Sequence, residues 1–376
     1  MPVYGEGAKG ILIVGEFPAA EEDDKGVPFV GKSGQYLQKV LRKYGVDLKR
    51  DCWSTNAARC RPEKNELPSI AVDHCRPFVQ KAIKELQPKT IILLGTAAVK
   101  SVIGMVWKED DSGEGVTRWV GWQIPNREPN AWICPTFHPS YCIRMDDAGN
   151  TVPGMFFERH IAAALEKEDR PWEVVPDYAA KVKRIYSGDA AASEIAQFAK
   201  SRAFAFDYET DRLKPDPSDS RIVCCAISDG ARTISFPWQG KAIDAMRELL
   251  VTPVPKIGAN SKFESRWTKR HLGVTVKNWW WDTVLGAHWM DNRRKITSVK
   301  FQAFVLLGQP SYNDHLERLL REPLIKGKKG ANFPNRIKEI DVKDLLLYAG
   351  IDALVEYKLA LVQMRRMNYP RPEGIK

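Results

Sequence analysis

The first 167 residues alternate short apolar runs with longer stretches of helical periodicity. Apolar runs of strand length occupy residues 11–15, 52–58, 89–95 and 131–137, and helical periodicity occupies residues 35–45, 71–87 and 155–168. Strands that alternate with helices are typical of a parallel sheet covered by helices on both faces. The pattern therefore predicts a three-layer α/β/α domain over residues 1–167.

A second alternation begins after a charged stretch with two prolines, residues 168–178. This composition is typical of a linker, which we place at residues 168–182. Three closely spaced strand-like segments follow an alanine-rich helix, at residues 202–213, 221–230 and 231–238. Their spacing indicates an antiparallel meander, and most of the chain beyond it has helical character. We therefore predict a second α/β domain with a different topology at residues 183–376.

Composition agrees with two folded domains. The length of 376 residues exceeds one ordinary domain, and the 44% of hydrophobic residues can supply a core to each. No apolar run approaches the ~20 residues of a membrane span, and seven irregularly spaced cysteines do not indicate a disulfide scaffold. We expect a protein of the reducing cytoplasm without a membrane partner. The net charge of +10 favours a polyanionic partner.

Two carboxylates interrupt the apolar segment 202–213. Side chains alternate along a strand, so Asp207 and Glu209 share one face. Neighbouring carboxylates repel each other, which makes the pair costly unless cations lie between them. A solvated strand edge is the alternative interpretation of this pair taken alone.

Two further motifs complete an ordered set of acidic residues. Asn260, Phe263 and Glu264 lie where a short strand gives way to a helix. Tyr348 and Asp352 are four residues apart, which places them on one face of a helix. In this order the motifs resemble the DEDD family of 3′–5′ exonucleases, in its tyrosine-bearing subgroup. They are most similar to the proofreading domain of family A DNA polymerases.

The resemblance implies a ribonuclease H-like mixed-sheet domain that hydrolyses phosphodiesters with two Mg²⁺ or Mn²⁺ ions. Asp207, Glu209 and Asp352 would be the core metal ligands, and Glu264 would bind its metal through water. Tyr348 would orient the attacking water. Glu264 stands where the family usually has Asp and reaches one methylene further, so we expect activity to survive. An exonuclease fold without activity is the alternative.

The resemblance covers about residues 183–367 and also implies contacts with single-stranded 3′ ends of DNA. Leu213, which follows the acidic strand, would wedge at the terminal base, and Asn260 and Phe263 would contact DNA. A basic loop could hold DNA phosphates through three lysines: Lys326, Lys328 and Lys329. A solvated basic loop is an equally good interpretation of these lysines.

The first domain carries polar and aromatic residues near the ends of its predicted strands. The carboxyl ends of parallel strands form a ligand crevice. A single pocket would therefore collect four side chains: Glu16, Phe29, Asn56 and His138. Each has an ordinary alternative: Phe29 in the core, Asn56 in a turn and His138 as a helix cap. Together with the segments PFVGKSGQ and CRP, they resemble the family-4 type of the uracil-DNA glycosylase superfamily, over nearly all of residues 1–165.

This resemblance implies a pocket for a base that is flipped out of DNA. Phe29 would stack on the base, and the Asn56 amide would pair with O4 and N3–H of uracil, which cytosine presents in reverse. His138 would stabilise charge on the departing base, and Glu16 or Glu22 would support the sugar or the water. A loop for nucleotide phosphates is the alternative, although the lysine of such loops is absent.

Two departures from this family bear on catalysis. The family typically has G-E-G-P-G where residues 15–19 read GEFPA, and larger side chains restrict the close backbone approach that glycine allows. The family also holds an iron–sulfur cluster on four cysteines. Only Cys60 and Cys75 match, because the other pair would fall before residue 1, so we expect no cluster. Cys52 and Cys134 could substitute, but they lie on strands that are expected to be buried.

The two resemblances meet in the N-terminal part of some bacteriophage family A DNA polymerases. Polymerase nucleotide-binding motifs are absent from the sequence. We therefore expect work beside a separate family A-type polymerase, in the cytoplasm of a bacterial or phage-infected cell. The leading hypothesis is a metal-dependent 3′–5′ DNA exonuclease with a uracil-DNA glycosylase-like accessory domain. The alternatives are a bifunctional repair enzyme that also excises uracil and a non-catalytic DNA-binding replication scaffold.

Overall fold

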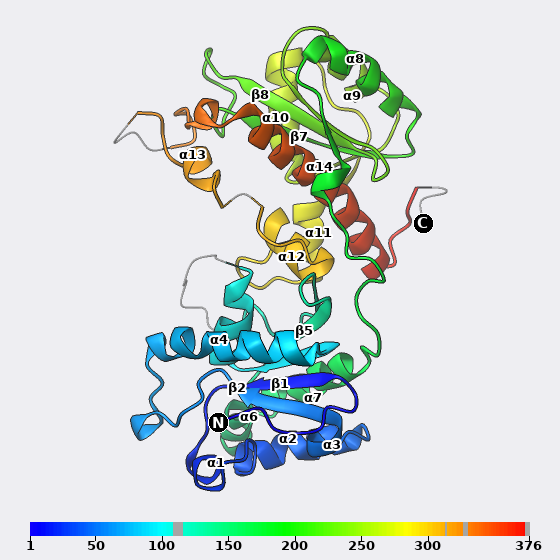
Figure 1. Cartoon of the computed structure of the whole chain (residues 1–376). Helices are drawn as coiled ribbons and strands as arrows, with labels where there is room; N and C mark the ends of the chain where they lie inside the picture. Colours follow the sequence, from blue (N-terminus) through cyan, green and yellow to red (C-terminus); the bar gives the residue numbers. More distant parts are fainter. Residues whose placement is uncertain (108–115, 313, 326–329, 373–376) are drawn as a thin grey trace. The chain divides into compact units, whose positions relative to one another are not determined.

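The computed structural model describes residues 1–107, 116–312, 314–325 and 330–372. The chain divides into two compact units (Figure 1): Met1–Pro176 with Phe304–Ser311, and Asp177–Ala303 with Tyr312–Lys376. Within the described ranges, no helix is both long and apolar enough to cross a bilayer.

The first unit contains a five-stranded sheet with helices on both faces. Its strands are β1 (Ile11–Gly15), β2 (Cys52–Asn56), β3 (Thr90–Leu94), β4 (Ile124–Asn126) and β5 (Ala131–Thr136). Its α-helices are α1 (Ala20–Lys25), α2 (Lys32–Lys43), α3 (Leu48–Asp51), α4 (Ser69–Leu86), α5 (Thr96–Val102), α6 (Pro139–Asp147) and α7 (Val152–Leu165). Two 3₁₀ turns are η1 (Glu63–Asn65) and η2 (Ile103–Met105).

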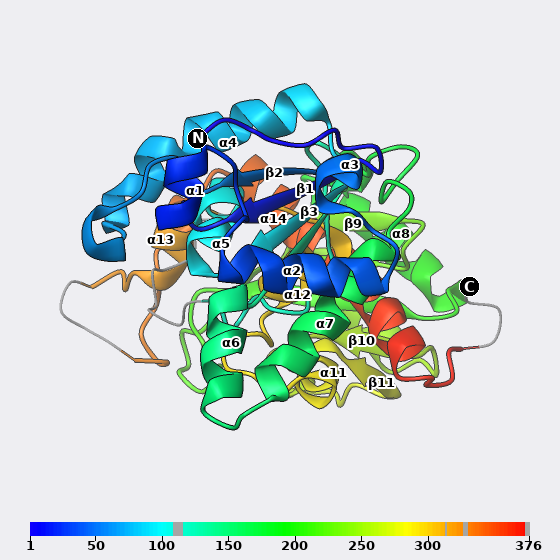
Figure 2. The ribbon, with the colours of Figure 1, turned by 90° about the horizontal axis from the view of Figure 1, so that it is seen from below.

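The strand order is β2-β1-β3-β5-β4, and β2, β1, β3 and β5 are parallel to one another. Strands β1 and β3 are buried along their whole length, as continuous apolar runs require in a sheet covered on both faces. Helices α2, α6 and α7 pack against one another on one face, and Figure 2 shows them side by side. The prediction of a parallel α/β/α sheet is confirmed. The short edge strand β4, which runs antiparallel to β5, is an addition that the pattern does not predict.

Two segments beyond α7 also belong to the first unit. The Arg170 guanidinium donates hydrogen bonds to the backbone carbonyls of Gln87, Pro129 and Asn130. These bonds hold the chain after α7 against the loops next to β3 and β5. The Phe304 ring lies 5.0 Å from that of Trp107, between ring centroids. The first unit therefore includes a short segment that comes late in the sequence.

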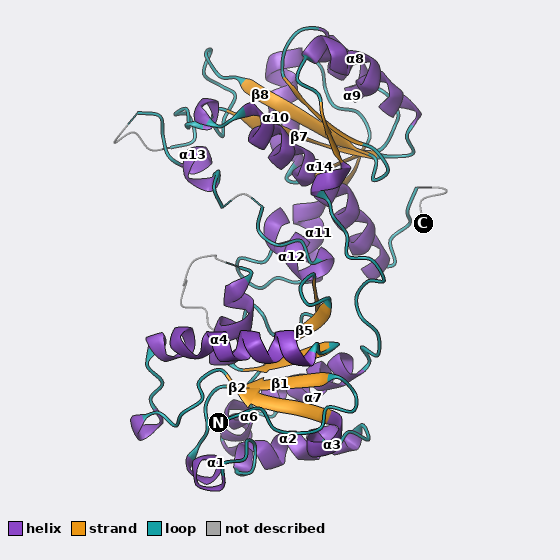
Figure 3. Ribbon diagram, viewed as in Figure 1, coloured by secondary structure: helices purple, strands orange, loops and turns teal. Residues whose placement is uncertain are grey.

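The second unit contains a mixed sheet, which Figure 3 draws in orange around β7 and β8. Its six strands lie in the order β11-β10-β7-β8-β9-β6. Its strands are β6 (Val182–Arg184), β7 (Phe204–Thr210), β8 (Ile222–Ser228), β9 (Thr233–Pro237), β10 (Lys256–Gly258) and β11 (Trp279–Asp282). Its α-helices are α8 (Gly188–Gln197), α9 (Lys241–Leu250), α10 (Ser261–Leu272), α11 (Thr283–Met290), α13 (Glu317–Arg321) and α14 (Val342–Arg366). Helix α12 (Val299–Leu307) begins in this unit, and the 3₁₀ turns are η3 (Ala179–Lys181), η4 (Phe198–Lys200) and η5 (Ile337–Glu339).

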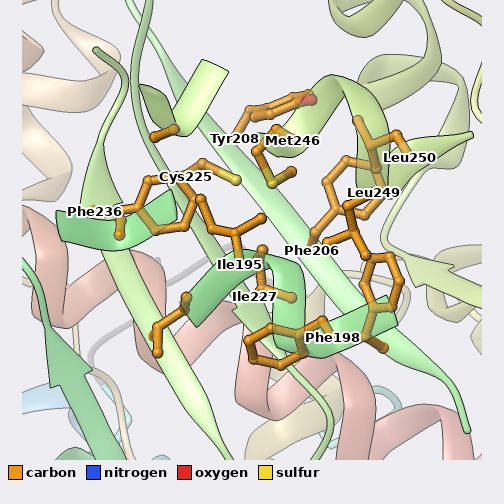
Figure 4. Close-up of a cluster of buried hydrophobic side chains, with 14 of the residues drawn as sticks. Ile195, Phe198, Phe206, Tyr208, Cys225, Ile227, Phe236, Met246, Leu249 and Leu250 are labelled. Atoms are coloured by element: carbon orange, nitrogen blue, oxygen red, sulfur yellow. The ribbon is translucent and has the colours of Figure 1, made fainter. Parts of the chain in front are cut away.

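Strands β7, β8 and β9 are antiparallel neighbours, so the predicted meander is confirmed. Strands β10 and β11 extend the sheet in parallel beyond β7, which makes it mixed. Alternation along β7 directs Phe204, Phe206 and Tyr208 into an apolar core shared with α8, α9 and α10 (Figure 4). The same alternation leaves Asp207 and Glu209 on the opposite face, against which α14 packs.

This core yields a prediction about stability. Phe206 is fully buried, so Phe206→Ala should lower the free energy of unfolding of the second unit by about 3–5 kcal/mol through lost burial and a cavity. Tyr186→Ala is the matched control, because Tyr186 is 51% exposed and its truncation should change stability by less than about 0.5 kcal/mol. Urea titration followed by tryptophan fluorescence measures both. Equal effects of the two substitutions would contradict the assigned core.

Candidate functional site

The carboxylate site is built from one strand and one helix of the second unit. Asp207 and Glu209 extend from β7 on the face that α14 covers, while Tyr208 between them points into the core and bonds Thr268 at 3.1 Å. Asp352 lies on α14. Asp207, Glu209 and Asp352 each offer a carboxylate oxygen, and these oxygens lie within 4.8 Å of one another. The structure thus brings together three of the four predicted metal ligands.

Burial and mutual repulsion dominate the electrostatics of this trio. Burial, followed by the nearby Asp352 carboxylate, raises the pKa of Asp207 to about 7. Burial and then Asp207 raise the pKa of Glu209 well above its usual range. A cation between the carboxylates would relieve both effects. Carboxylate oxygens are the ligands that Mg²⁺ and Mn²⁺ prefer, so the donor set fits divalent cations of this kind.

Glu264 occupies a neighbouring position outside the trio. It lies in the first turn of α10 and is 1% exposed, and its Oε2 atom has no hydrogen-bond partner among the described residues. Burial and then the charge of Asp207 raise the pKa of its carboxyl well above the usual range. Glu264 therefore faces the same charge cluster as the trio, although its oxygens are not within the 4.8 Å that unites the other three.

Tyr348 lies four residues before Asp352 on α14, as predicted, and is buried. Glu356 continues the same row at the next four-residue step and escaped the sequence prediction. It is 3% exposed, its Oε2 atom has no hydrogen-bond partner in the described structure, and burial and then Asp207 raise its pKa. The four-residue spacing after Asp352 was a signal that could have identified it.

Lys300 and Tyr312 also contact the site, and no sequence motif marks them. The Lys300 ammonium donates a hydrogen bond of 3.1 Å to the Tyr348 hydroxyl. The Tyr312 hydroxyl donates to Oδ1 of Asp352, and its ring lies 6.0 Å from that of Tyr348. Both residues lie between α11 and α14, Lys300 in the first turn of α12 and Tyr312 in the segment after that helix, and no pattern in the sequence places either of them at the site.

Leu213 follows the acidic strand on a turn that is held rigidly. Arg212 is buried and donates hydrogen bonds to the carboxylates of Asp211 and Asp219 and to the backbone carbonyl of Asn332. The next side chain, Leu213, is 70% exposed. An apolar side chain presented to solvent from a fixed turn suits the wedge that was predicted for it.

Two of the other predicted DNA contacts, Asn260 and Phe263, lie at the start of α10. Asn260 is exposed at the start of α10 with a positive φ of 62°, and its backbone N–H donates to the Asp282 carboxylate. Phe263 is half-buried and packs on Trp267, with ring centroids 5.9 Å apart. The three predicted basic contacts lie outside the described residues: Lys326, Lys328 and Lys329.

The first unit forms a second candidate site at the carboxyl ends of its parallel strands. Gly15 ends β1 between two predicted pocket residues, because a Cβ there would lie 2.4 Å from Asn56 Oδ1 and 2.9 Å from Phe29 Cζ. Only glycine leaves space for that pair. The Asn56 side chain and the Phe29 ring are thus brought together as predicted.

Gly95, after β3, has the same role for the other two residues. A Cβ there would lie 2.6 Å from Glu16 Oε1 and 3.0 Å from His138 Cβ, and its φ of +86° also favours glycine. The Glu16 carboxylate accepts a hydrogen bond of 3.4 Å from the Ala97 backbone N–H. Glu16 and His138 therefore flank the backbone at the end of β3.

His138 caps α6 through its ring, as the ordinary alternative for it proposed. Nδ1 accepts a hydrogen bond of 3.2 Å from the Ser140 backbone N–H, so the proton of the neutral ring lies on Nε2. Burial lowers the pKa of His138, and the nearby Glu16 charge partly opposes that effect. A neutral imidazole with a fixed Nε2–H is a hydrogen-bond donor, so capping and a role in the pocket are compatible.

Glu22 is buried in α1 and shapes the loop that carries Phe29. Its Oε1 atom accepts a hydrogen bond of 2.8 Å from the Gly31 backbone N–H. Phe29 has a φ of 60°, which is rare for a side chain of this size and requires support from its surroundings. The Gln38 amide supplies another part of that support by donating to the Phe29 carbonyl at 3.0 Å.

The cysteines of the first unit are the candidate ligands for an iron–sulfur cluster. Cys60 is exposed and Cys75 is partly exposed, whereas Cys52 and Cys134 are buried thiols whose pKa burial raises to about 12. Across the described chain, the carboxylate trio is the only group of three or more His, Cys, Asp or Glu with clustered ligand atoms. The described residues therefore do not assemble the four thiolates that such a cluster takes.

Comparison with protein families gives one match for each unit. The family described as the uracil DNA glycosylase superfamily matches residues 2–166, and the family described as 3′-5′ exonuclease matches residues 183–365. Among curated proteins, the type-4 uracil-DNA glycosylase of Pyrobaculum aerophilum is 34% identical over 151 residues, which cover 38% of this chain and 73% of that protein. The type-4 uracil-DNA glycosylase of Thermotoga maritima is 33% identical over 150 residues, which cover 38% of this chain and 71% of that protein.

Among solved structures, Brucella melitensis NrnC with bound Mg²⁺ aligns with a TM-score of 0.36 and 18% identity, and covers 50% of this chain and 81% of that one. Escherichia coli RNase D, an exoribonuclease involved in structured RNA processing, aligns with a TM-score of 0.36 and 14% identity. The alignment covers 50% of this chain and 45% of RNase D.

The raised pKa of Asp207 predicts how stability depends on pH and metal. The unfolded chain releases this carboxyl proton near pH 4, whereas the folded chain retains it to about pH 7. Unfolding in that window releases a proton, so the metal-free protein should lose stability as pH rises from 5 to 8. Mg²⁺ or Mn²⁺ at pH 8 should restore the thermal midpoint.

Thermal midpoints in EDTA at pH 5 and pH 8 measure this effect. Asp207→Asn should reduce the fall, and the exposed carboxylate of Asp244 supplies the control Asp244→Asn, which should leave it unchanged. A midpoint in EDTA that stays constant or rises between the two pH values would contradict the assigned charge cluster.

Proposed function

We propose that this protein is a metal-dependent 3′–5′ DNA exonuclease with a base-binding accessory domain. The chain belongs to the uracil-DNA glycosylase superfamily through residues 2–166, and it carries a 3′-5′ exonuclease domain at residues 183–365. The observation that carries the proposal is the clustered trio of Asp207, Glu209 and Asp352, with Tyr348 one helical turn from Asp352. Such a cluster is costly for a protein unless it holds cations.

Asp207, Glu209 and Asp352 would hold the metal, with Glu264 close by to act through water. Divalent cations bound there would supply activation of the water and stabilisation of the leaving 3′ oxygen. Tyr348 would orient the attacking water, because its hydroxyl lies at the edge of the same cluster. Leu213, exposed on its fixed turn, would separate the terminal base from the rest of the strand.

DNA is the proposed substrate because the other unit belongs to a superfamily that acts on bases in DNA. We place the protein in replication, as a proofreading or DNA-processing enzyme beside a separate family A-type polymerase. The support for this setting is the pairing of the two domains, which resembles the N-terminal part of some bacteriophage polymerases. Mg²⁺ is the expected physiological ion.

The first unit is proposed to bind a flipped base without efficiently cleaving the bond between that base and its sugar. Asn56 would pair with the base, Phe29 would stack on it, and the His138 Nε2–H would face it. Glu16 is the better candidate to support the sugar, since it lies with His138 beside Gly95, whereas Glu22 holds the Gly31 backbone. Phe17 stands where the family has glycine, and this should obstruct the nucleotide.

A bifunctional enzyme that also excises uracil is the second candidate. The observation that favours it is the placement of Glu16 and His138 on either side of Gly95, where a carboxylate and an imidazole donor could serve one nucleotide. Asn56 and Phe29 complete the set that base excision needs.

The exonuclease is tested by substitution at the trio. Asp207→Ala should reduce Mg²⁺-dependent release of nucleotides from a 3′-labelled single strand by at least about a hundredfold, because even outer partners of metal sites contribute 10- to 100-fold. Asp244→Ala, at an exposed carboxylate, should retain full activity. Glu264→Asp should keep or raise activity, since it restores the usual family residue. Intact 3′ ends with the unaltered protein in both Mg²⁺ and Mn²⁺ would favour the scaffold alternative.

The accessory domain is tested with a uracil-containing strand. The unaltered protein should release little or no uracil, and Phe17→Gly combined with Ala19→Gly should raise the release by about tenfold or more, because the nucleotide could then reach a productive position. Gas chromatography with mass detection of free uracil measures it. Robust release by the unaltered protein that His138→Ala abolishes would instead establish the bifunctional enzyme.

A further inference from the structure

Lys300 is a cation in the carboxylate site to which the family pattern assigns no role here. It lies in the first turn of α12 and is half-buried. Its ammonium donates a hydrogen bond of 3.1 Å to the Tyr348 hydroxyl and lies 4.9 Å from the centre of the same ring. Lys300 therefore contacts the tyrosine through both its oxygen and its π face, which fixes the position of the ammonium closely.

The surroundings of Lys300 are acidic on every described side that faces the trio. From β7, Asp207 and Glu209 act on it, and from α14 Asp352 does, and its charge lowers the pKa of each of these carboxyls. Tyr312 bonds Asp352 on the same side of the cluster. One protein cation thus lies among the carboxylates that are proposed to hold metal.

The bond from Lys300 determines which way the Tyr348 hydroxyl is polarised. An ammonium has three donors and no acceptor, so the phenol oxygen must accept from it. The hydroxyl hydrogen must then point elsewhere, and the Asp352 carboxylate, one turn further along the same face of α14, is an acceptor on that side.

We infer that Lys300 is a positioning residue for the exonuclease, which holds the Tyr348 hydroxyl so that its proton faces the carboxylate cluster where the attacking water is ordered. The inference rests on the proposed function, since it assigns Lys300 a part in that reaction. Its chemistry is indirect: Lys300 acts through Tyr348 and contacts neither the water nor the phosphate. A lysine that bound the substrate phosphate instead would act independently of the tyrosine.

A double-substitution cycle distinguishes these roles. Lys300→Met removes the donor and keeps the length of the side chain. It should lower kcat about tenfold or more on single-stranded DNA with KM unchanged, which is the usual contribution of a positioning contact. Tyr348→Phe should lower kcat similarly, and Lys300→Met should have no further effect in the Tyr348→Phe background. Lys300→Arg, which keeps charge and donors, should restore part of the rate.

Mn²⁺ binding, followed by electron paramagnetic resonance, gives a readout that does not depend on turnover. Lys300→Met removes a positive charge from the cluster, so Mn²⁺ should bind several-fold more tightly while kcat falls. A substitution that merely disturbed the fold would weaken both. Lys241→Met, at an exposed lysine of α9, is the matched control and should change neither quantity. Thermal midpoints of all variants report whether the fold is retained.

The other possible results of these measurements would overturn the role assigned to Lys300 or the proposed function. A rise in KM, or a full additional loss of rate when Lys300→Met is added to Tyr348→Phe, would overturn the inference and make Lys300 a phosphate-binding residue. Unchanged kcat and unchanged Mn²⁺ affinity would also overturn it. If the unaltered protein does not digest DNA, the proposed function fails and the inference with it. Tighter Mn²⁺ binding by Lys300→Met would then still locate the charge of Lys300 within the metal site.

Discussion

The burial of like charges between a strand and a helix is the constraint on which the second unit depends. Asp207, Glu209 and Asp352 converge where α14 covers β7, and burial raises the pKa of all three carboxyls. The apolar core on the other face of β7 stabilises the fold enough to maintain this arrangement. Cations between the carboxylates would offset this cost, which connects the fold to the two-metal hydrolysis that we propose.

In the first unit the main constraint is steric and not electrostatic. Gly15 and Gly95 end two parallel strands, and each lies between two pocket residues that a Cβ would displace. The same physical logic makes Phe17 important, because it adds a large side chain in the loop directly after Gly15 and Glu16. A pocket with its recognition residues in place and its entrance narrowed would bind a base but would cleave it from its sugar poorly. The first unit would then bind bases, and the second unit would carry out hydrolysis, as we propose.

Much of both sites could be predicted because periodicity and order in the sequence determine it. Strand alternation places Asp207 beside Glu209, and helix spacing places Tyr348 beside Asp352. Lys300 and Tyr312 could not be predicted, because tertiary packing brings the start of α12 and the segment after it to the site, and no sequence motif marks either position. Glu356 was predictable in principle, since it continues the row of α14 by one more turn. The grouping of Phe304–Ser311 with the first unit has no signal in composition or periodicity.

The central claim is that the carboxylate cluster directs hydrolysis from the 3′ end. The most direct measurement uses a single strand with ³²P in the 5′-phosphate of its terminal 3′ nucleotide, digested with Mg²⁺ in water enriched in ¹⁸O. Attack of water on phosphorus with departure of the 3′ oxygen predicts that the label appears first as a nucleoside 5′-monophosphate that has gained ¹⁸O, and that EDTA prevents its release. Label that stays at the strand end, or that first appears in longer internal fragments, would contradict the account.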